Sequence, residues 1–459
     1  MKYFRLLISL VIITIIIGNV QAQAISYQYG LGGEFRNSPR KALKINDSQT
    51  ILAGTSNSHE SGTHQSSAYG FDDYWVVCLN NGQVVWEKAY GGDYYESLSN
   101  VLLLSDGNIL LSGYSRSDIS GVKTEASRGD ADLWIVKTDT SGTILWEKTI
   151  GGDFFDSPTK LIELNDGRIL ILCTSNSSIS GEKTLAPKYN SAGIYSDIWG
   201  VIIASTSGNV QDQFLIGGNK DEHVVDAMIN EDSKLVLVAD SYGEASGDKT
   251  LDSIGGADIW IVEYNLNTKQ IVNQQLYGGT SDDYVSALLK VDDEYILTGM
   301  STSGISGNKT TSSFGQSDIW VIKVNQNLDL IDQASFGGLG VDVTTLSNAV
   351  FRSLNHQIII AAGSNSPSGN GGTKTSPHYG DIDGYVLGIN AETLEQRWDF
   401  SLGGTEDDFA RTVMIDKNEE ISVLCYSQSG QNGNKSVPLI GETDYWFVQL
   451  GNTTGVEDL

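Results

Sequence analysis

The feature that most constrains the fold is a repeat with a period of about 60 residues. Gly-Gly pairs that follow strand-like runs recur seven times, in steps of 59, 60, 66, 61, 59 and 66 residues. They lie at Gly32-Gly33, Gly91-Gly92, Gly151-Gly152, Gly217-Gly218, Gly278-Gly279, Gly337-Gly338 and Gly403-Gly404. An Asp-x-aromatic marker recurs in the same phase, at Asp73/Trp75, Asp132/Trp134, Asp197/Trp199, Asp258/Trp260, Asp318/Trp320, Asp383/Tyr385 and Asp444/Trp446. Two independent markers in one phase predict seven equivalent structural units.

Each period holds four short strand-like stretches and no sustained helical periodicity. In the second repeat these stretches are residues 98–105, 108–114, 133–138 and 143–149. Asp106-Gly107 separates the first two and is a tight-turn signal. Four strands per unit and seven units in one chain predict an all-β fold, a seven-bladed β-propeller with four-stranded antiparallel blades.

The two ends of the repeat array are complementary. The array begins with an isolated fourth strand at residues 25–33 and ends after a third strand at residues 445–450. We therefore expect the N-terminal strand to complete the last blade, which closes the ring and removes an open sheet edge.

The third strand of each unit indicates burial on both faces. "DLWIVK" is apolar at adjacent positions, whereas a strand with one wet face alternates. All nine Trp fall at two repeat positions, the third strand and, for Trp86, Trp146 and Trp398, the fourth strand. We interpret them as wedges between blades, each burying about 150–250 Å². An aromatic platform for sugars is the alternative.

The first 22 residues predict a secretory signal peptide. Lys2 and Arg5 precede an apolar run that is shorter than the roughly 20 residues of a membrane span, and small residues follow it. We expect the protein to be secreted or held at the cell surface, with the periplasm as the alternative. The predicted organisation is a signal peptide at 1–22, one propeller at 23–450 with repeat phases starting near 33, 92, 152, 218, 279, 338 and 404, and a tail at 451–459.

The charge balance narrows the class of partner. The chain carries 29 basic and 57 acidic residues, a net charge of −28 at pH 7. Such a chain repels nucleic acid and anionic membrane surfaces. The three Cys, at 78, 173 and 425, lie in different repeats and are expected to be buried thiols. We expect a monomer with no membrane span, and the sequence implies no cofactor firmly.

Two polar positions recur with the repeat and are expected on the same rim of the ring. The fourth residue after each Gly-Gly is Asn37, Glu96, Asp156, Glu222, Asp283, Asp342 or Asp408. A Lys in the loop between the second and third strands recurs at Lys123, Lys183, Lys249, Lys309, Lys374 and Lys435, with His64 in the first repeat. In a structural interpretation, the acids accept backbone N–H bonds and the Lys pairs with an acid. In a functional one, the acids bind cations, with calcium the best match to oxygen ligands, although no loop has EF-hand spacing.

Functional residues are more often found where a repeat is broken. The third repeat has a longer loop with Tyr189 and Tyr195, and the sixth has a divergent loop with His378 and Tyr379. Aromatic residues on loops above a rigid ring are candidate ligand contacts. Simple divergence of these loops is the alternative interpretation.

Enzyme motifs are weak in this sequence. The five His have no spacing typical of a metal site, and G-x-S-x-G does not occur. We assign no catalytic residue. A glycosidase with paired carboxylates stays open, because sequence alone does not give the distance between acids.

At "DLWIVKTDTSGTILWEKTIGG" and its copies, the chain resembles the β-propeller repeat proteins that bacteria secrete. Those carry D-x-W-[IV]-V-K-x-D-x-x-G-x-x-x-W followed by Gly-Gly, and the resemblance covers residues 25–450. It implies the fold, export, and a role in binding or display. The motif also resembles the tryptophan-docking repeat of quinoprotein dehydrogenases, whose eight blades and quinone site have no match here. The tail "NTTGVEDL" resembles the linker before a sorting domain in type IX secretion substrates, so either the sorting domain is missing from this sequence or the likeness is accidental.

The sequence thus predicts a secreted, non-catalytic binding module for an extracellular glycan or protein. The alternatives are a propeller enzyme acting on extracellular polysaccharide and a structural protein of the cell surface.

Overall fold

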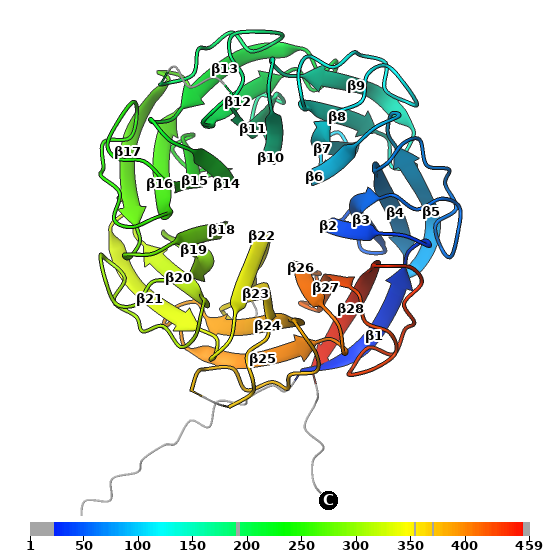
Figure 1. Cartoon of the computed structure of the whole chain (residues 1–459), viewed down its shortest axis with the longest axis vertical. Helices are drawn as coiled ribbons and strands as arrows, with labels where there is room; N and C mark the ends of the chain where they lie inside the picture. Colours follow the sequence, from blue (N-terminus) through cyan, green and yellow to red (C-terminus); the bar gives the residue numbers. More distant parts are fainter. Residues whose placement is uncertain (1–22, 190–192, 353–354, 370, 453–459) are drawn as a thin grey trace, which may run out of the picture.

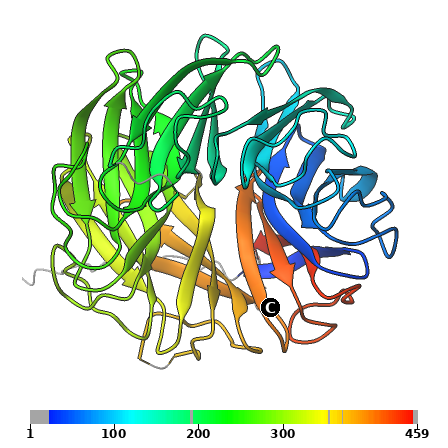
Figure 2. The same ribbon diagram turned by 45° about the horizontal axis from the view of Figure 1, so that its top comes forward.

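The computed structural model describes residues 23–189, 193–352, 355–369 and 371–452. Within these residues, 28 strands form seven four-stranded antiparallel sheets and no helix occurs. The sheets are arranged around a common centre as the blades of a propeller (Figure 1), and the tilted view shows them standing side by side around the ring axis (Figure 2). The predicted fold is therefore confirmed. The predicted signal peptide and residues 453–459 of the tail lie outside the described residues.

Each of the first six blades is built from four consecutive strands, and the first of the four lies nearest the centre (Figure 1). Blade 1 contains β2 (Asn37–Lys44), β3 (Gln49–Ser56), β4 (Asp73–Asn80) and β5 (Gln83–Tyr90). Blade 2 contains β6 (Glu96–Leu103), β7 (Ile109–Ser115), β8 (Asp132–Thr138) and β9 (Ile144–Ile150). Blade 3 contains β10 (Asp156–Glu163), β11 (Ile169–Ser175), β12 (Asp197–Ile203) and β13 (Val210–Ile216). Blade 4 contains β14 (Glu222–Ile229), β15 (Leu235–Ser241), β16 (Asp258–Asn265) and β17 (Gln270–Tyr277). Blade 5 contains β18 (Asp283–Val291), β19 (Glu294–Ser301), β20 (Asp318–Val324) and β21 (Leu330–Phe336). Blade 6 contains β22 (Asp342–Arg352), β23 (Gln357–Ser364), β24 (Asp383–Asn390) and β25 (Gln396–Leu402).

Blade 7 joins the two ends of the chain, as the sequence predicts. It contains β26 (Asp408–Ile415), β27 (Ile421–Ser427), β28 (Asp444–Asn452) and β1 (Gln23–Leu31), in that order from the centre outward. β1 runs antiparallel to β28, with Gln23 opposite Asn452 and Leu31 opposite Tyr445. The edge of β28 is thereby covered and the ring is closed.

The apolar core lies between the blades, and the third-strand Trp of each blade packs against the blade before it. Trp134 of blade 2 clusters with Ile51 of blade 1. Trp320 of blade 5 clusters with Val236 of blade 4 in the same way. At the seam of the ring, Trp75 of blade 1 meets Tyr445 of blade 7 with ring centroids 4.7 Å apart.

The third-strand Trp side chains are the predicted wedges, and the alternative of a sugar platform is wrong for them. All six are 0% exposed, so no ligand can reach their rings. They are Trp75, Trp134, Trp199, Trp260, Trp320 and Trp446. Tyr385, which takes the same position in blade 6, is also 0% exposed.

The innermost strands carry a β-bulge that shapes the central channel. In six blades one residue is inserted three positions after the repeated polar residue, between Pro39 and Lys41 in blade 1 and at equivalent places in the others. The inserted residues are Arg40, Ser99, Thr159, Val225, Ser286 and Arg411. In blade 6 the irregularity is longer and lies between Thr344 and Ala349. A bulge redirects side chains, and four of the inserted residues, Arg40, Ser99, Thr159 and Arg411, line a central cavity.

Candidate functional site

The repeated acids are structural. The acid at the start of each inner strand accepts the backbone N–H of the second glycine, from Gly92 to Glu96 Oε2 at 2.7 Å and at 2.6–2.8 Å in the other five blades with an acid. The carboxylate of each Asp-x-aromatic motif accepts a backbone N–H from the loop before it at 2.6–2.9 Å. These bonds hold both kinds of loop on one rim, as the structural interpretation predicts.

Both halves of the Asp-x-aromatic motif contact the framework of the ring. Asp132 is buried and bonded to the backbone of Arg128 at 2.7 Å, while Trp134 lies in the core between blades 1 and 2. Asp318 is bonded to the backbone of Phe314 at 2.8 Å, while Trp320 lies in the core between blades 4 and 5.

The repeated Lys does not pair with an acid, so that part of the expectation is wrong. In the described residues each of the six ammonium groups donates to a main-chain carbonyl of its own loop, for example Lys183 to Ser177 O at 2.7 Å and Lys309 to Thr311 O at 3.0 Å. Lys183 lies 5.6 Å from the ring centroid of Trp199, within cation–π range. The loop carbonyls accept the hydrogen bonds that an exposed ammonium group would donate to water. In blade 1, His64 stacks on Trp75 at 4.7 Å in place of the Lys.

The four candidate ligand residues lie on two opposite blades. Tyr189 is 61% exposed, and the hydroxyl of Tyr195 accepts a hydrogen bond from Lys220 Nζ at 2.7 Å; both belong to the blade 3 loop. His378 Nδ1 lies 3.0 Å from Asp383 Oδ2, and the backbone N–H of Tyr379 donates to the same oxygen at 2.7 Å. Blades 3 and 6 face each other across the ring (Figure 1), so the structure does not bring the four residues together. Their role in binding stays a prediction.

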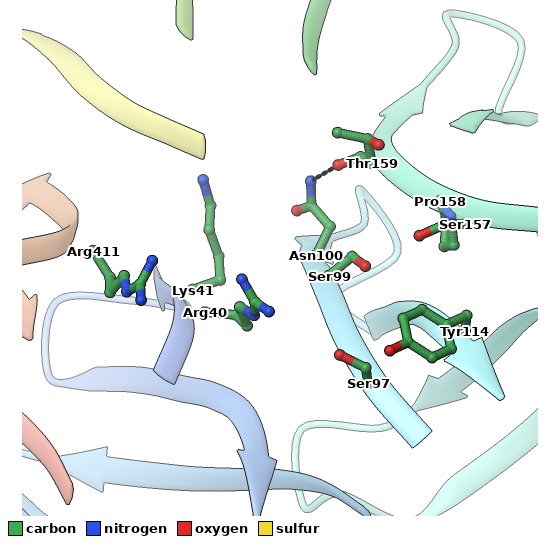
Figure 3. A pocket seen from close by; sticks show the side chains of 10 residues that line it. All are labelled: Arg40, Lys41, Ser97, Ser99, Asn100, Tyr114, Ser157, Pro158, Thr159 and Arg411. Atoms are coloured by element: carbon green, nitrogen blue, oxygen red, sulfur yellow. Dashed lines mark hydrogen bonds between the residues drawn. The ribbon is translucent and has the colours of Figure 1, made fainter. Parts of the chain in front are cut away.

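The strongest candidate site is a cavity in the central channel, beside the seam between the first and last blades. It has a volume of about 230 Å³ and is lined by Arg40, Lys41, Ser97, Ser99, Asn100, Tyr114, Ser157, Pro158, Thr159 and Arg411. The cationic side chains come from blades 7 and 1, and the uncharged ones from blades 2 and 3 (Figure 3). Thr412 Oγ1 donates to Arg40 O at 3.1 Å, which fixes the two cationic strands relative to each other.

Three cationic side chains, those of Arg40, Lys41 and Arg411, are concentrated in this cavity. Within the described part of the chain, no carboxylate forms an ion pair with Arg40 or Lys41, and Asp226, the acid that acts on Lys41, is paired with Lys160 at 2.5 Å. Burial, together with the charge of Lys160, lowers the pKa of Lys41 to about 8. Burial, together with the charge of Arg40, lowers the pKa of Arg411 to about 10. Mutual repulsion of this kind favours an anion that neutralises it.

Arg411 is held in place by aromatic rings. Its guanidinium carbon lies 5.2 Å from the ring centroid of Phe409 and 5.7 Å from that of Tyr426. A planar guanidinium fixed in this way can offer its N–H groups to a carboxylate, phosphate or sulfate.

A second hollow continues the cavity to the rim. It has a volume of about 410 Å³ and shares Arg40, Ser97 and Tyr114 with the inner cavity. Arg36 and Arg116 also line it. Arg36 is held by Asp72, with Nη2 2.7 Å from Oδ2, and Arg116 lies 3.3 Å from Asp130 Oδ2. Four of the nine arginines in this acidic chain thus line one continuous hollow.

Sequence reasoning missed these residues because the arginines as a group show no repeat phase. Arg40 and Arg411 nevertheless each lie three positions after the first residue of an inner strand, Asn37 and Asp408. Alignment on the repeated acid would have placed them at equivalent positions of blades 1 and 7. It would not have shown that these blades are neighbours unless the predicted ring closure was applied as well.

Clusters of metal-binding side chains and long apolar helices are two further features to consider in the described residues. No three His, Cys, Asp or Glu side chains there gather in a way that could hold a metal ion. No helix there is long and apolar enough to span a bilayer. Binding of calcium stays a prediction.

Comparison with known proteins yields fold-level likeness alone. No protein-family model matches the chain, and no curated protein is significantly similar to it. Among solved structures, hydrazine synthase of Kuenenia stuttgartiensis is 12% identical with a TM-score of 0.46, covering 90% of this chain and 94% of that chain. A protein of unknown function from Bacteroides caccae is 10% identical with a TM-score of 0.40, covering 78% and 94%. A variant of an apocarotenoid oxygenase from Synechocystis is 11% identical with a TM-score of 0.41, covering 75% and 73%. Likenesses this low carry no information on activity.

Proposed function

We propose that the chain is an exported, non-catalytic binding module whose central cavity takes an anionic ligand. The observation that carries the proposal is the group of cations at the seam, where Arg40 and Lys41 line the cavity with no acid paired to them in the described residues. Unpaired charge held at close quarters costs stability, so it is a feature of a binding site more than of a scaffold.

The overall charge strengthens this proposal. A chain with a net charge of −28 repels anions at long range. Binding an anion therefore requires a local concentration of positive charge, which the cavity provides. None of the ten residues that line it is Asp or Glu. Because a glycosidase of the usual kind needs two carboxylates at its reacting centre, this cavity favours binding over that alternative.

The proposed location follows from the first 22 residues. Their basic start, apolar run and small residues at the end are those of a secretory leader. An extracellular or cell-surface anion is the ligand that such a protein would meet.

The test is calorimetric titration of residues 23–459 with galacturonate, inorganic phosphate and inorganic sulfate, with neutral galactose for comparison. We expect at least one of the anions to bind and galactose not to bind. We also expect Arg40→Gln to weaken that binding by about tenfold, since a hydrogen bond to a charged group contributes about 1.5–3 kcal/mol.

The matched control is Arg168→Gln, which removes an arginine paired with Asp166 at 2.6 Å, away from the cavity. It should leave the affinity unchanged. Equal affinities for Arg40→Gln and Arg168→Gln, or binding of galactose as tight as that of the anions, would contradict the proposal.

A further inference from the structure

Three aromatic side chains form a cluster beside the mouth of the cavity. Phe71 stacks on Tyr95 with centroids 5.1 Å apart and an interplanar angle of 17°, and its edge meets Tyr94 at 5.5 Å. Tyr94 and Tyr95 meet edge to face at 4.7 Å. Phe71 is 56% exposed and Tyr94 45% exposed. We call these three residues the mouth cluster. Solvent-exposed rings held rigidly by one another offer a preformed apolar surface.

The mouth cluster is continuous with the cationic cavity. Tyr95 lines the outer hollow together with Arg36, Arg116 and Tyr114, and that hollow shares Arg40 with the inner cavity. A ligand lying on the cluster therefore has a direct path to the cations. The two volumes, about 410 and 230 Å³, suit an elongated ligand of more than one ring.

The side of the inner cavity that blades 2 and 3 form carries free hydroxyl groups. Ser97, Ser99, Tyr114, Ser157 and Thr159 all line the inner cavity. In the part of the chain that the structure describes, none of their five side-chain hydroxyls takes part in a hydrogen bond. Asn100 is different, because its amide nitrogen donates to Thr159 O at 2.9 Å and so holds its side chain against the neighbouring blade. The free hydroxyls are donors and acceptors directed at whatever occupies the cavity.

We infer that the ligand is an acidic saccharide, which stacks a sugar ring on the mouth cluster and places its carboxylate or sulfate among Arg40, Lys41 and Arg411. This inference rests on the proposed function and names its ligand class. Each part of the surface then has a matching part of the ligand. The aromatic rings take the apolar face of a pyranose, the free hydroxyls take its hydroxyl groups, and the cations take its acid group.

Other ligand classes leave part of the surface unused. A neutral saccharide would leave the cations uncompensated and pay to desolvate them. An acidic peptide would satisfy the cations, but it lacks the ring hydroxyls that five free hydroxyl groups can bind. A simple inorganic anion would not reach the mouth cluster.

The experiment compares ligand length and charge in one titration series. The probes are galacturonate, galactose sulfate, tetragalacturonate, a sulfated galactan tetrasaccharide, neutral galactotetraose and tetraglutamate. The variants are the double substitution Phe71→Ala with Tyr94→Ala, and Arg40→Gln. The control is Phe154→Ala, which removes an exposed ring at the position that is equivalent to Tyr94 in the next repeat. The backbone bond from Phe71 N to Tyr94 O at 2.8 Å is retained in the double variant.

We expect one of the acidic tetrasaccharides to bind about tenfold more tightly than its monosaccharide, and the preferred arm identifies carboxylate or sulfate as the acid group. The double variant should lose that gain while binding the acidic monosaccharide within about twofold of the unchanged protein, because it removes the two exposed rings on which the additional sugar units would stack. Arg40→Gln should weaken the binding of both the acidic tetrasaccharide and its monosaccharide.

The two proposals fail in different ways. Full tetrasaccharide affinity in the double variant, tighter binding of tetraglutamate, or no binding of any acidic saccharide overturns the saccharide inference alone. Unchanged binding of all anions in Arg40→Gln overturns the anion site itself.

Discussion

The two glycines that mark each repeat are required for different reasons. A Cβ on Gly278 would lie 2.0 Å from Asp258 Oδ1, so the first glycine makes room for the Asp-x-Trp carboxylate. A Cβ on Gly279 would lie 2.5 Å from the Cβ of Ser303, so the second makes room for the serine of the neighbouring loop. Each Gly-Gly pair thus marks two places on the rim where a neighbouring side chain lies too close to the backbone for a Cβ.

We expect Gly278→Ala to lower the free energy of unfolding by about 1–3 kcal/mol, the usual cost of forcing extra volume into a packed site. Gly304→Ala is the matched control, because a Cβ there meets nothing within 4 Å. Chemical denaturation of both variants gives the comparison. Equal stability of the two would contradict this account of the repeat.

At the scale of residues, the sequence predicted structural roles better than binding roles. The acids were predictable because each kind recurs in six or seven blades and accepts a backbone N–H at the equivalent place in each. The roles of Arg40 and Arg411 could not be predicted in this way, because a binding site occurs once in the chain and gives no periodic signal. The interpretation of the Lys was half right. The position of its loop was predicted correctly. The main-chain carbonyls that accept hydrogen bonds from its ammonium group were not, because every residue has a carbonyl and the sequence pattern shows only side chains.

At the scale of elements, β1 is the strand whose absence should matter most. Its Gln28 Oε1 accepts hydrogen bonds from Trp446 Nε1 at 3.1 Å and from Ser436 N at 2.8 Å. In other blades the fourth strand supplies the same acceptor from within the blade, as Gln274 does for Trp260 at 3.2 Å. Loss of β1 would leave both donors of blade 7 unpaired and its edge open.

Deletion of residues 25–30 should therefore destabilise the whole ring by several kcal/mol, a large share of the about 5–15 kcal/mol typical of a folded domain. Thermal melting followed by circular dichroism measures the loss. Addition of a peptide of residues 23–33 should recover part of it. An unchanged Tm in the deletion variant would show that the ring does not depend on its closing strand.

Element boundaries were predictable because turn signals and Gly-Gly pairs delimit every strand. The bulge in the inner strands was not predictable from the sequence. It depends on packing around the channel, and neither "SPRK" in blade 1 nor "FART" in blade 7 carries a glycine that would mark it.

At the scale of the whole molecule, buried acids couple stability to pH. Burial is the main cause that raises the pKa of Glu222 to about 8 and those of Asp73 and Asp240 to about 7. It also raises the pKa of Asp197 and Asp444 to about 6. An acid whose pKa is raised in the folded state binds its proton more tightly there than in the unfolded chain. Its contribution to stability is complete below the unfolded pKa and is lost as pH rises through the folded pKa.

We therefore expect the Tm to rise as the pH falls from 8 to 5, with each group contributing on the order of 1 kcal/mol per pH unit within its own range. The reduced net negative charge acts in the same direction. Glu222→Gln should melt at a higher temperature than the unchanged protein at pH 8, and its Tm should depend less on pH. A Tm that falls steadily from pH 8 to 5 would contradict this prediction.

The seam also links recognition to completion of the chain. Thr412 and Arg40 are 372 positions apart, yet they are hydrogen-bonded beside the cationic cavity. A nascent chain that has not yet produced blade 7 lacks Arg411 and the hydrogen bond from Thr412 to Arg40. Such incomplete copies would bind the ligand more weakly than the closed ring does. A ligand bound to Arg411 of blade 7 and Arg40 of blade 1 would contact both blades at once. It would thereby stabilise the seam at which the two ends of the chain close the ring.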